Sequence, residues 1–552
     1  MKNILIAAAW PYVNGDLHVG HTGGYLLPAD IIAKYHRLIG NNVCMVSGAD
    51  CHGTPVTVEA EKNNISPQEV VDKYYPTHLE IFKKLNISFD IYTKTTTQNH
   101  INTVQEVFLA LLNNGFIFKK SSFQFFSEKE NKFLPDRYVQ GICPFCNKLT
   151  SADQCENCNK IIEASDLKEP VSKLTKNPVI LKETEHYYMD WKKTEGFLKT
   201  YFDTHKDNWK DWVQSETKAW LDQGLLPRPI TRDMDWGIEI PKNKIPENLL
   251  IENIENKRIY VWFEAVIGYL SATKELLKNK YVDFWFNENC KQYYFMGKDN
   301  LVFHTVFWPA QLHSFNTDIN LPDVLSINNF FNLEGKKFSK SKGVTISNIY
   351  MVDTYGLDQT RFYLASISPE NNDSNFTWKD FQQKTNDVLN SNFGNLVNRI
   401  LKLFKDYDIP NMEPSNEIIE KIKETKEKVC LSLEKVEIKN YVNSFCSLID
   451  FSNKYLSIKA PWKNKENIDE FNQTMIDCFY LLIAIDILIK PLLIESSKKI
   501  EDMLNINISN WEDDIISQIK ENILKIKRKD DIRPIFSRIE DDQINIEIEK
   551  LN

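Results

Sequence analysis

Two histidines, His18 and His21, lie three positions apart in the stretch AAAWPYVNGDLHVGH. The apolar residues before them predict a buried strand, VNGD predicts a turn, and residues 17–39 have the apolar spacing of a helix. Both imidazoles are therefore expected on the first turn of a helix, where unpaired N–H groups and the helix dipole attract phosphates. An isolated H-x-x-H pair is more often two ordinary helix-face histidines, so both interpretations stay open at this point.

Four cysteines form two C-x-x-C pairs at close spacing. They are Cys143, Cys146, Cys155 and Cys158. Two such turns can present four thiolates tetrahedrally, an arrangement that suits zinc. The surrounding segment is polar and rich in turns, and we expect it to lack an apolar core of its own, which argues against free or redox-active thiols. Four protein ligands fill the coordination shell, so the zinc is predicted to be structural.

A lysine-rich loop, GKKFSKSKG, occupies residues 335–343. It can be a solvated basic turn. Lysines on a mobile loop can also neutralise a polyphosphate whose charge rises in a transition state. Together with a helix that begins at a histidine pair, the second interpretation is favoured.

Composition limits the possible classes of protein. The chain has 552 residues, a hydrophobic content of 42% and a net charge of −9, so bulk charge does not indicate a nucleic-acid partner. The longest apolar run, residues 478–494, contains Asp486 and Lys490 and is short for a bilayer, which predicts a buried helix and no membrane partner. Without a leader pattern or a disulfide framework, we expect a cytoplasmic protein.

The elements that must position these residues form two regions. Strand-like segments alternate with helical ones up to residue 114, which predicts a parallel sheet. An insertion at 115–230 interrupts it, and the sheet pattern returns with KRIYVWFEAVIGYL, QYYFMGKDN and LPDVLSINNF. From residue 381 glycine is almost absent and helical patterns dominate, although DDQINIEIEKLN weakly favours a strand.

At this point the motifs indicate a family. HVGH and KFSKS resemble the two signature motifs of class I aminoacyl-tRNA synthetases. WPYVNGDLHVGH, SGADCHGTP, LPDRYVQGICPFC, RDMDWGIEIP, YVWFEAVIGY, GKDNLVFHTVFWPA and KAPW are similar to successive blocks of the methionyl-tRNA synthetases. The resemblance covers essentially the whole chain.

The resemblance implies an α/β fold class: a split Rossmann-like parallel-sheet catalytic domain with a zinc-binding insertion, followed by an all-α anticodon-binding domain. The expected divisions are 1–114 for the first half of the catalytic domain, 115–230 for the connective insertion, 231–325 for the second half, 326–380 for a stem-contact region with the KFSKS loop, and 381–552 for the anticodon-binding domain.

The implied reaction has two steps. L-methionine and ATP with Mg²⁺ give methionyl-adenylate and pyrophosphate, and the methionyl group then passes to the 3′ end of initiator or elongator methionine tRNA. The catalytic residues implied are His18, His21, Lys337 and Lys340, of which Lys340 is the favoured pyrophosphate-binding lysine. The ATP-binding set is His18, Gly20, His21, Gly297, Asp299, Lys337 and Lys340.

The resemblance also implies two recognition sites. Asp50 is expected to bind the substrate ammonium within a methionine pocket formed by Ala9, Trp10, Tyr12, Asp50, Trp262, Tyr269 and His304. Asn395, Arg399 and Trp462 are expected to read the anticodon. Without the resemblance, Trp262 and Tyr269 would be interpreted as core residues and Trp462 as packing at a helix start.

Five positions depart from the family pattern. Phe338 replaces the usual Met in the lysine loop, Trp10 is bulkier than a common Leu, and Cys51 replaces an acidic residue. Asn328 and Asn329 stand where a His-Gly pair is common, which puts the adenine contact in question.

Three other functions fit only part of the sequence pattern. A synthetase for leucine, isoleucine or valine normally needs a longer editing insertion, and one for cysteine uses a zinc ion in its pocket. A non-catalytic tRNA-binding paralogue retains the fold without the chemistry, but the catalytic motifs are intact. A ligase for a small molecule leaves the helical domain unexplained. We expect a monomer, because no dimerising domain is recognised.

Overall fold

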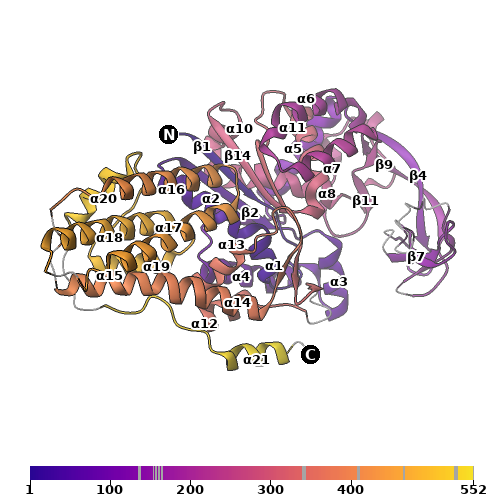
Figure 1. Cartoon of the computed structure of the whole chain (residues 1–552). Helices are drawn as coiled ribbons and strands as arrows, with labels where there is room; N and C mark the ends of the chain where they lie inside the picture. The colour runs from indigo at the N-terminus through magenta and orange to yellow at the C-terminus, as the bar shows by residue number, and fades with distance from the viewer. Residues whose placement is uncertain are drawn as a thin grey trace.

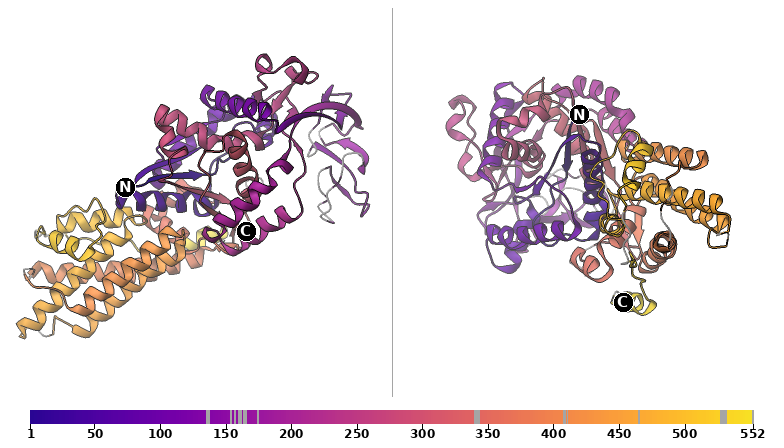
Figure 2. Two further views of the ribbon diagram at one scale, coloured as in Figure 1. Left: turned by 90° about the horizontal axis from the view of Figure 1, so that it is seen from above. Right: turned by 90° about the vertical axis from the view of Figure 1, so that its left-hand side faces the viewer.

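The computed structural model describes residues 1–134, 138–152, 155, 158, 162, 166–173, 175–338, 344–406, 409, 411–463, 466–526 and 532–550. Figure 1 shows an elongated molecule with an α/β body in the middle, a helical domain at one end and a small β module at the other. The view from above in Figure 2 shows the same order of parts along the long axis.

A five-stranded parallel sheet forms the centre of the α/β body, in the order β15-β14-β1-β2-β3. Its strands are β1 Asn3–Ala8, β2 Asn42–Ala49, β3 Ile91–Lys94, β14 Cys290–Gly297 and β15 Val324–Asn328. The chain leaves β1 toward β2 on one side and returns to β14 on the other. The strand order therefore reverses beside β1, and ligands bind parallel sheets at such a point beyond the carboxyl ends of the strands.

Helices pack against both faces of this sheet because its strands are apolar along their length. Residues 4–9 and 293–296 are all buried. The helices of the first half are α1 Val19–His21, α2 Leu27–Leu38, α3 Thr54–Asn63, α4 Pro67–Leu85 and α5 Gln98–Asn113. Those of the second half are α8 Val261–Glu264, α9 Gly268–Leu277, α10 Val282–Trp285 and α11 Trp308–Phe315.

Two expectations from the pattern were wrong. In KRIYVWFEAVIGYL, β13 Lys257–Ile259 does not join the parallel sheet but pairs antiparallel with β11 Thr231–Asp233 and β12 Ile238–Glu239. The tail at 541–549 is the helix α21 Asp541–Glu549, not a strand. Glu540 and Gln543 form a capping box at its start, and two aspartates in its first turn suit the helix dipole.

The insertion consists of a long ribbon, a small β module and two helices. The ribbon pairs β4 Ile117–Ser127 with β9 Ile180–Met189, and β5 Lys132–Phe133 and β10 Arg228–Pro229 extend it. The module at its tip contains β6 Val139–Ile142, β7 Leu149–Ser151 and β8 Lys168–Ser172. Helices α6 Glu195–His205 and α7 Asp211–Asp222 lead back to the body.

The cysteine segment has an apolar core of its own, contrary to expectation. Phe125, Val139, Leu167 and Val179 form a separate buried cluster with Cys143, Cys155 and neighbouring residues. Phe125 belongs to β4 of the ribbon and Val179 lies directly before β9, and both are distant in sequence from the cysteines. A local pattern of polar residues therefore could not reveal the cluster.

Residues 326–380 connect the two large regions. They contain β16 Phe331–Leu333, β17 Lys336–Lys337, β18 Ser374–Phe376, α12 Asn348–Tyr355, α13 Leu357–Ser366 and the start of α14 Trp378–Lys384. The expected divisions after residues 325 and 380 fall inside β15 and α14, and the domain division stays a prediction.

The C-terminal region is helical throughout its described elements. After a π-helical segment at Thr385–Gly394, it contains α15 Asn395–Asp406, α16 Asn416–Glu434, α17 Ile438–Lys459, α18 Ile468–Ile489, α19 Ile494–Leu504 and α20 Ile515–Ile523. Among the described residues, α18 alone is long and apolar enough to cross a membrane, and 89% of its most apolar window is buried. The expected buried helix is confirmed.

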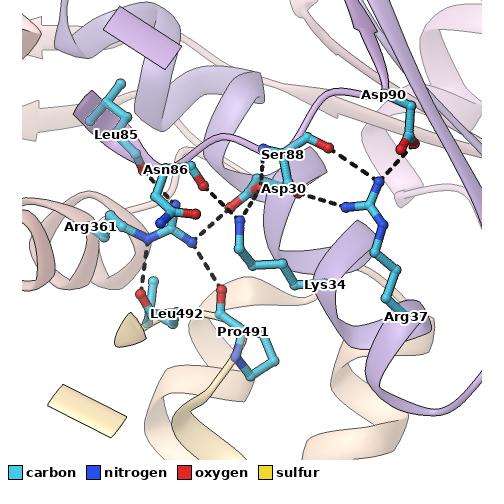
Figure 3. Close-up of polar contacts among 10 residues, drawn as sticks. All are labelled: Asp30, Lys34, Arg37, Leu85, Asn86, Ser88, Asp90, Arg361, Pro491 and Leu492. Atoms are coloured by element: carbon cyan, nitrogen blue, oxygen red, sulfur yellow. Dashed lines mark hydrogen bonds and ion pairs between the residues drawn. The ribbon is translucent and has the colours of Figure 1, made fainter. Parts of the chain in front are cut away.

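A buried cluster of charges joins the helical region to the α/β body (Figure 3). The Arg361 guanidinium on α13 lies 2.8 Å from Asp30 Oδ2 on α2, and both side chains are wholly buried. Arg361 also donates hydrogen bonds to the carbonyl oxygens of Leu85, Pro491 and Leu492. One side chain therefore connects α4, α2 and the link between α18 and α19.

Candidate active site

A pocket of about 1220 Å³ opens beyond the carboxyl ends of β1 and β14. It is lined by every described residue of the two predicted substrate sets: Ala9, Trp10, Tyr12, His18, Gly20, His21, Asp50, Trp262, Tyr269, Gly297, Asp299, His304 and Lys337. Lys340 lies outside the described residues. Residues separated by almost 330 positions thus meet in one cavity, as the switch point of the sheet predicts.

The histidine pair begins the helix, as its spacing predicts. His18 is the N-cap of α1, and His21 ends that single turn before a π-helix at Thr22–Leu26 and then α2. Gly20 N donates to His18 Nδ1 and His18 N donates to His21 Nδ1, both at 3.2 Å. Since each Nδ1 accepts a hydrogen bond, each neutral ring carries its proton on Nε2.

Gly20 allows this arrangement. A Cβ atom at Gly20 would lie 2.9 Å from two atoms of the His18 ring. The two imidazole centroids are 4.0 Å apart, so the pair forms one compact polar surface on the pocket.

Phe338 occupies the family's methionine position without disturbing this surface. Its ring stacks on His18 with a centroid distance of 4.7 Å and an interplanar angle of 6°.

The neighbouring Lys337 ammonium lies 5.3 Å from the centre of the Phe330 ring. Burial raises the pKa of Asp299, against the opposing effect of Lys298 and Lys337.

Asp50 follows β2 directly and is only 4% exposed. Its backbone N–H donates to Pro11 O at 2.9 Å, which fixes it beside the strand-end turn of β1. Burial, and then the nearby Glu264 carboxylate, raise the pKa of Asp50 to about 8. A buried carboxyl at the edge of a pocket is suited to a cationic ligand, which favours its ionised form.

The walls near Asp50 are aromatic. Trp262 stacks on Phe303 at 4.4 Å and meets Tyr12 edge-on at 6.3 Å. Tyr269 Oη lies 2.8 Å from His304 Nε2, and His304 Nδ1 lies 2.9 Å from Asn300 O. A carbonyl only accepts, so Nδ1 carries the proton and Nε2 accepts from the tyrosine.

Burial lowers the pKa of His304 to about 4, so its imidazole is neutral at pH 7. The Tyr269–His304 pair therefore presents polar atoms without a charge to the pocket. Neutral aromatic walls of this kind suit a polarisable thioether.

Trp10 fits the pocket because two glycines leave space for its ring. A Cβ at Gly48 would lie 2.4 Å from Trp10 Cζ3, and one at Gly268 would lie 2.7 Å from Trp10 Cε2.

Asn329, which stands where the family commonly has Gly, needs no glycine conformation, since it is not among the residues with positive φ. Its backbone N–H donates to Pro369 O at 2.8 Å.

Sequence reasoning missed several residues of the pocket. Arg232 stacks over Tyr260 with its guanidinium carbon 4.3 Å from the ring centre, and both line the cavity. Other lining residues not predicted include Tyr25, Arg228, Val266, Asn300, Phe303, Phe307, Gln311 and Phe330. Some belong to the blocks RDMDWGIEIP, YVWFEAVIGY and GKDNLVFHTVFWPA, but nothing local distinguishes a lining position there from a buried one.

Comparisons with known proteins agree with this geometry. Residues 4–401 match the family model of class I tRNA synthetases (M), and residues 410–550 match that of the anticodon binding domain of methionyl tRNA ligase. The chain is 39% identical to methionine–tRNA ligase of Roseiflexus sp. (strain RS-1), over 91% of this chain and 87% of that one. The chain belongs to the methionyl-tRNA synthetase family.

A further relative supports the assignment, and a solved structure supports the fold. Methionine–tRNA ligase 1 of Bacillus cereus is 36% identical over 100% of this chain and 99% of its own. The fold matches that of a Mycobacterium tuberculosis methionyl-tRNA synthetase in complex with methionyl-adenylate, with a TM-score of 0.78, 22% identity, and coverage of 98% and 100%. The expected ligase class and the α/β plus all-α fold class are confirmed.

The cysteine tetrad of this synthetase has the geometry of a zinc site. The four Sγ atoms lie within 4.8 Å of one another, with Cys143 to Cys158 at 3.8 Å and Cys146 to Cys155 at 3.5 Å. A tetrahedron with Zn–S bonds of ~2.3 Å places its sulfurs ~3.8 Å apart. The donor set therefore fits one structural zinc ion.

The three predicted anticodon residues of the synthetase lie together. Asn395 begins α15, and Arg399 follows one turn later on the same face. The Arg399 guanidinium carbon is 5.0 Å from the Trp462 ring centre, and Trp462 is 40% exposed. An exposed indole beside an arginine is a suitable surface for stacking an unpaired base.

Proposed function

We propose that this chain activates L-methionine with ATP and transfers the methionyl group to the 3′ end of methionine tRNA. The observation that carries the proposal is one pocket with a buried carboxyl, Asp50, at one end and the His18 and His21 pair with Lys337 at the other. Curated relatives at 36–39% identity are methionine–tRNA ligases, so the non-catalytic alternative is not favoured.

In the first step, a carboxylate oxygen of methionine attacks the α-phosphorus of ATP, and pyrophosphate leaves. Asp50 binds the methionine ammonium, and the neutral Tyr269–His304 pair with Trp10 and Trp262 surrounds the thioether side chain. This fixes the carboxylate opposite the nucleotide, and such positioning lowers the barrier without a covalent enzyme intermediate.

The opposite end of the pocket stabilises the departing phosphates. His18 and His21 each offer an Nε2–H donor at a helix start, and Lys337, with Lys340 by resemblance, supplies positive charge. Gly20 keeps the backbone close to the nucleotide, while Gly297 and Asp299 at the end of β14 face the ribose. ATP enters with Mg²⁺, which neutralises phosphate charge.

In the second step, a hydroxyl of the terminal tRNA ribose attacks the methionyl carbonyl, and AMP leaves. Asn395, Arg399 and Trp462 hold the anticodon, with the base stacked on Trp462. The exposed Trp462 ring and the Arg399 guanidinium over it support this role. The same enzyme serves both initiator and elongator methionine tRNAs, and it acts in the cytoplasm as a monomer.

Zinc bound by Cys143, Cys146, Cys155 and Cys158 would cross-link the module at the tip of the insertion. The thiolates supply the whole donor set, so the ion stabilises the fold and takes no part in the reaction.

Pyrophosphate exchange tests the first step. Labelled pyrophosphate should enter ATP in the presence of methionine and without tRNA, and not with leucine, isoleucine, valine or cysteine. No exchange with any amino acid from a folded, zinc-loaded protein contradicts the proposal. Charging of initiator and elongator tRNA transcripts tests the second step, with anticodon-altered transcripts as controls, and sedimentation tests the monomer.

A further inference from the structure

Two carboxylates lie buried side by side at the amino-acid end of the pocket. Asp50 is 4% exposed, and Glu264, the last residue of α8, is 0% exposed. Glu264 is the first electrostatic cause, after burial, of the raised pKa of Asp50. Two neighbouring buried carboxylates cannot both stay ionised without a compensating positive charge.

His52 contacts both carboxylates. Its ring Nδ1 lies 2.8 Å from Glu264 Oε1, and its backbone N–H donates to Asp50 Oδ1 at 3.2 Å. The side chain is almost completely buried, and the Trp236 ring lies edge-on against it at 5.4 Å. Trp236 Nε1 donates to Cys51 O at 2.7 Å, so the segment from Asp50 to His52 is fixed from outside.

The remaining titratable neighbours carry no charge at pH 7. Burial raises the pKa of the Cys51 thiol to about 12. Burial, and then His52, lower the pKa of His100 to about 3.

His52 itself has a raised pKa. Burial opposes a charge on its imidazole, but Glu264 and then Asp50 outweigh the effect of burial. When the substrate ammonium lies beside Asp50 and favours its ionised form, the group of Asp50, His52 and Glu264 therefore holds two negative charges and one positive charge.

We propose that His52 is a positioning residue that, as an imidazolium bonded to Glu264, leaves Asp50 as the single uncompensated charge facing the substrate ammonium. The proposal rests on the proposed function, because it assumes that Asp50 binds methionine. It assigns to the His52–Glu264 pair the preference for a cationic α-amine over a neutral group at the same position.

Two single variants separate this charge role from a structural one. His52→Gln and Glu264→Gln both remove the ionic contact between the two side chains, but only His52→Gln leaves two carboxylates without a positive charge between them. His52→Gln leaves two unbalanced carboxylates, so the pKa of Asp50 should rise further, by about one unit or more, and the KM for methionine in pyrophosphate exchange should rise at least about tenfold at pH 7. The kcat should change by less than about threefold, because the binding energy lost is the same in the ground state and in the transition state.

Glu264→Gln removes one carboxylate and with it the reason for a charge on His52. Asp50 remains the only charge, so KM should stay within about threefold of the wild-type value. The double variant has the same charge as Glu264→Gln. Its KM for methionine should therefore return from the raised value of His52→Gln to near the wild-type value.

The pH dependence gives an independent readout. The ratio of KM between His52→Gln and wild type should fall as pH rises from 6.5 to 9, because Asp50 ionises again in the variant. Dividing by wild type removes the ionisation of methionine itself. The 2-hydroxy analogue of methionine, which carries a neutral hydroxyl in place of the ammonium, should as an inhibitor bind wild type and His52→Gln within about threefold of each other.

Equal losses in the two single variants, an additive loss in the double variant, or a KM ratio independent of pH would overturn the proposal. Thermal melting checks that each variant folds. Where His52→Gln alone does not fold, a tenfold rise in KM for Glu264→Gln or for the double variant overturns it, and values within threefold support it. Absence of methionine-dependent exchange in wild type contradicts the proposed function instead.

Discussion

The two ends of the pocket are built differently. At the amino-acid end, Asp50, Tyr269 and His304 are buried, and a hydrogen bond or a neighbouring charge holds each of them. At the phosphate end, His18 and His21 are only half-buried, and the Lys337 side chain comes from an exposed hairpin.

This difference indicates how each end recognises its ligand. Burial makes the amino-acid end selective. The low polarity of the site strengthens the interaction of each charge, and the buried hydrogen bonds of His304 fix its tautomer. The phosphate end must admit and release a highly charged group, so it uses backbone N–H groups and side chains that stay hydrated. Perturbing the buried end should therefore alter methionine recognition, and perturbing the open end should alter turnover.

Asp50→Asn should have the largest effect. It leaves the substrate ammonium without a charged partner in a buried site, which costs about 2–5 kcal/mol, so kcat/KM for methionine should fall by about 30-fold to 4000-fold. Steady-state exchange with varied methionine measures it. A decrease below tenfold would show that the buried end is not the ammonium site.

His21→Ala should affect the open end. Loss of one donor to the developing phosphate charge should lower kcat by about 10² and leave the KM for methionine unchanged. His21→Asn is the matched control, since it retains a donor. A rise in the KM for methionine without a change in kcat would contradict the division between the two ends.

The pH dependence of wild type should distinguish the ends without mutation. Since burial and Glu264 raise the pKa of Asp50 to about 8, its ionised form increases as pH rises toward that value. The KM for methionine should therefore fall by about tenfold between pH 6.5 and 8, while the KM for ATP changes little. A flat profile for methionine would mean that Asp50 is ionised throughout this interval.

Trp10→Leu should have a moderate effect at the buried end. It removes aromatic contacts with the substrate sulfur and leaves space beside Gly48 and Gly268, so KM for methionine should rise about fivefold. Adding Gly268→Ala should recover part of the loss by refilling that space. Exchange assays with both variants test this, and an unchanged KM in Trp10→Leu would place the substrate away from the indole.

Phe338→Met should have the smallest effect, because it exchanges one apolar contact with His18 for another at the open end. We expect kcat and the KM for ATP to stay within about threefold of wild type. Stopped-flow or steady-state exchange measures both constants. A tenfold loss would give the aromatic stack a role in positioning His18.

Much of the fold and site was predictable because the signals are local. The H-x-x-H pair after a strand and turn, the paired C-x-x-C turns and the change in composition near residue 381 each depend on neighbours in sequence. The tail at 541–549 was misread because alternation over a few residues does not distinguish a strand from a capped helix.

Other features depend on residues that are far apart in the chain, and no local pattern encodes them. Gly48 and Gly268 make space for Trp10, and the ribbon completes the core of the cysteine module. Arg361 joins three segments through one buried ion pair and three hydrogen bonds to carbonyl oxygens. Charge, hydrogen-bond capacity and helix periodicity are properties of the residues themselves, so they can be read from the sequence. The pKa of Asp50 and the tautomer of His304 arise from burial and from partners that come together only on folding.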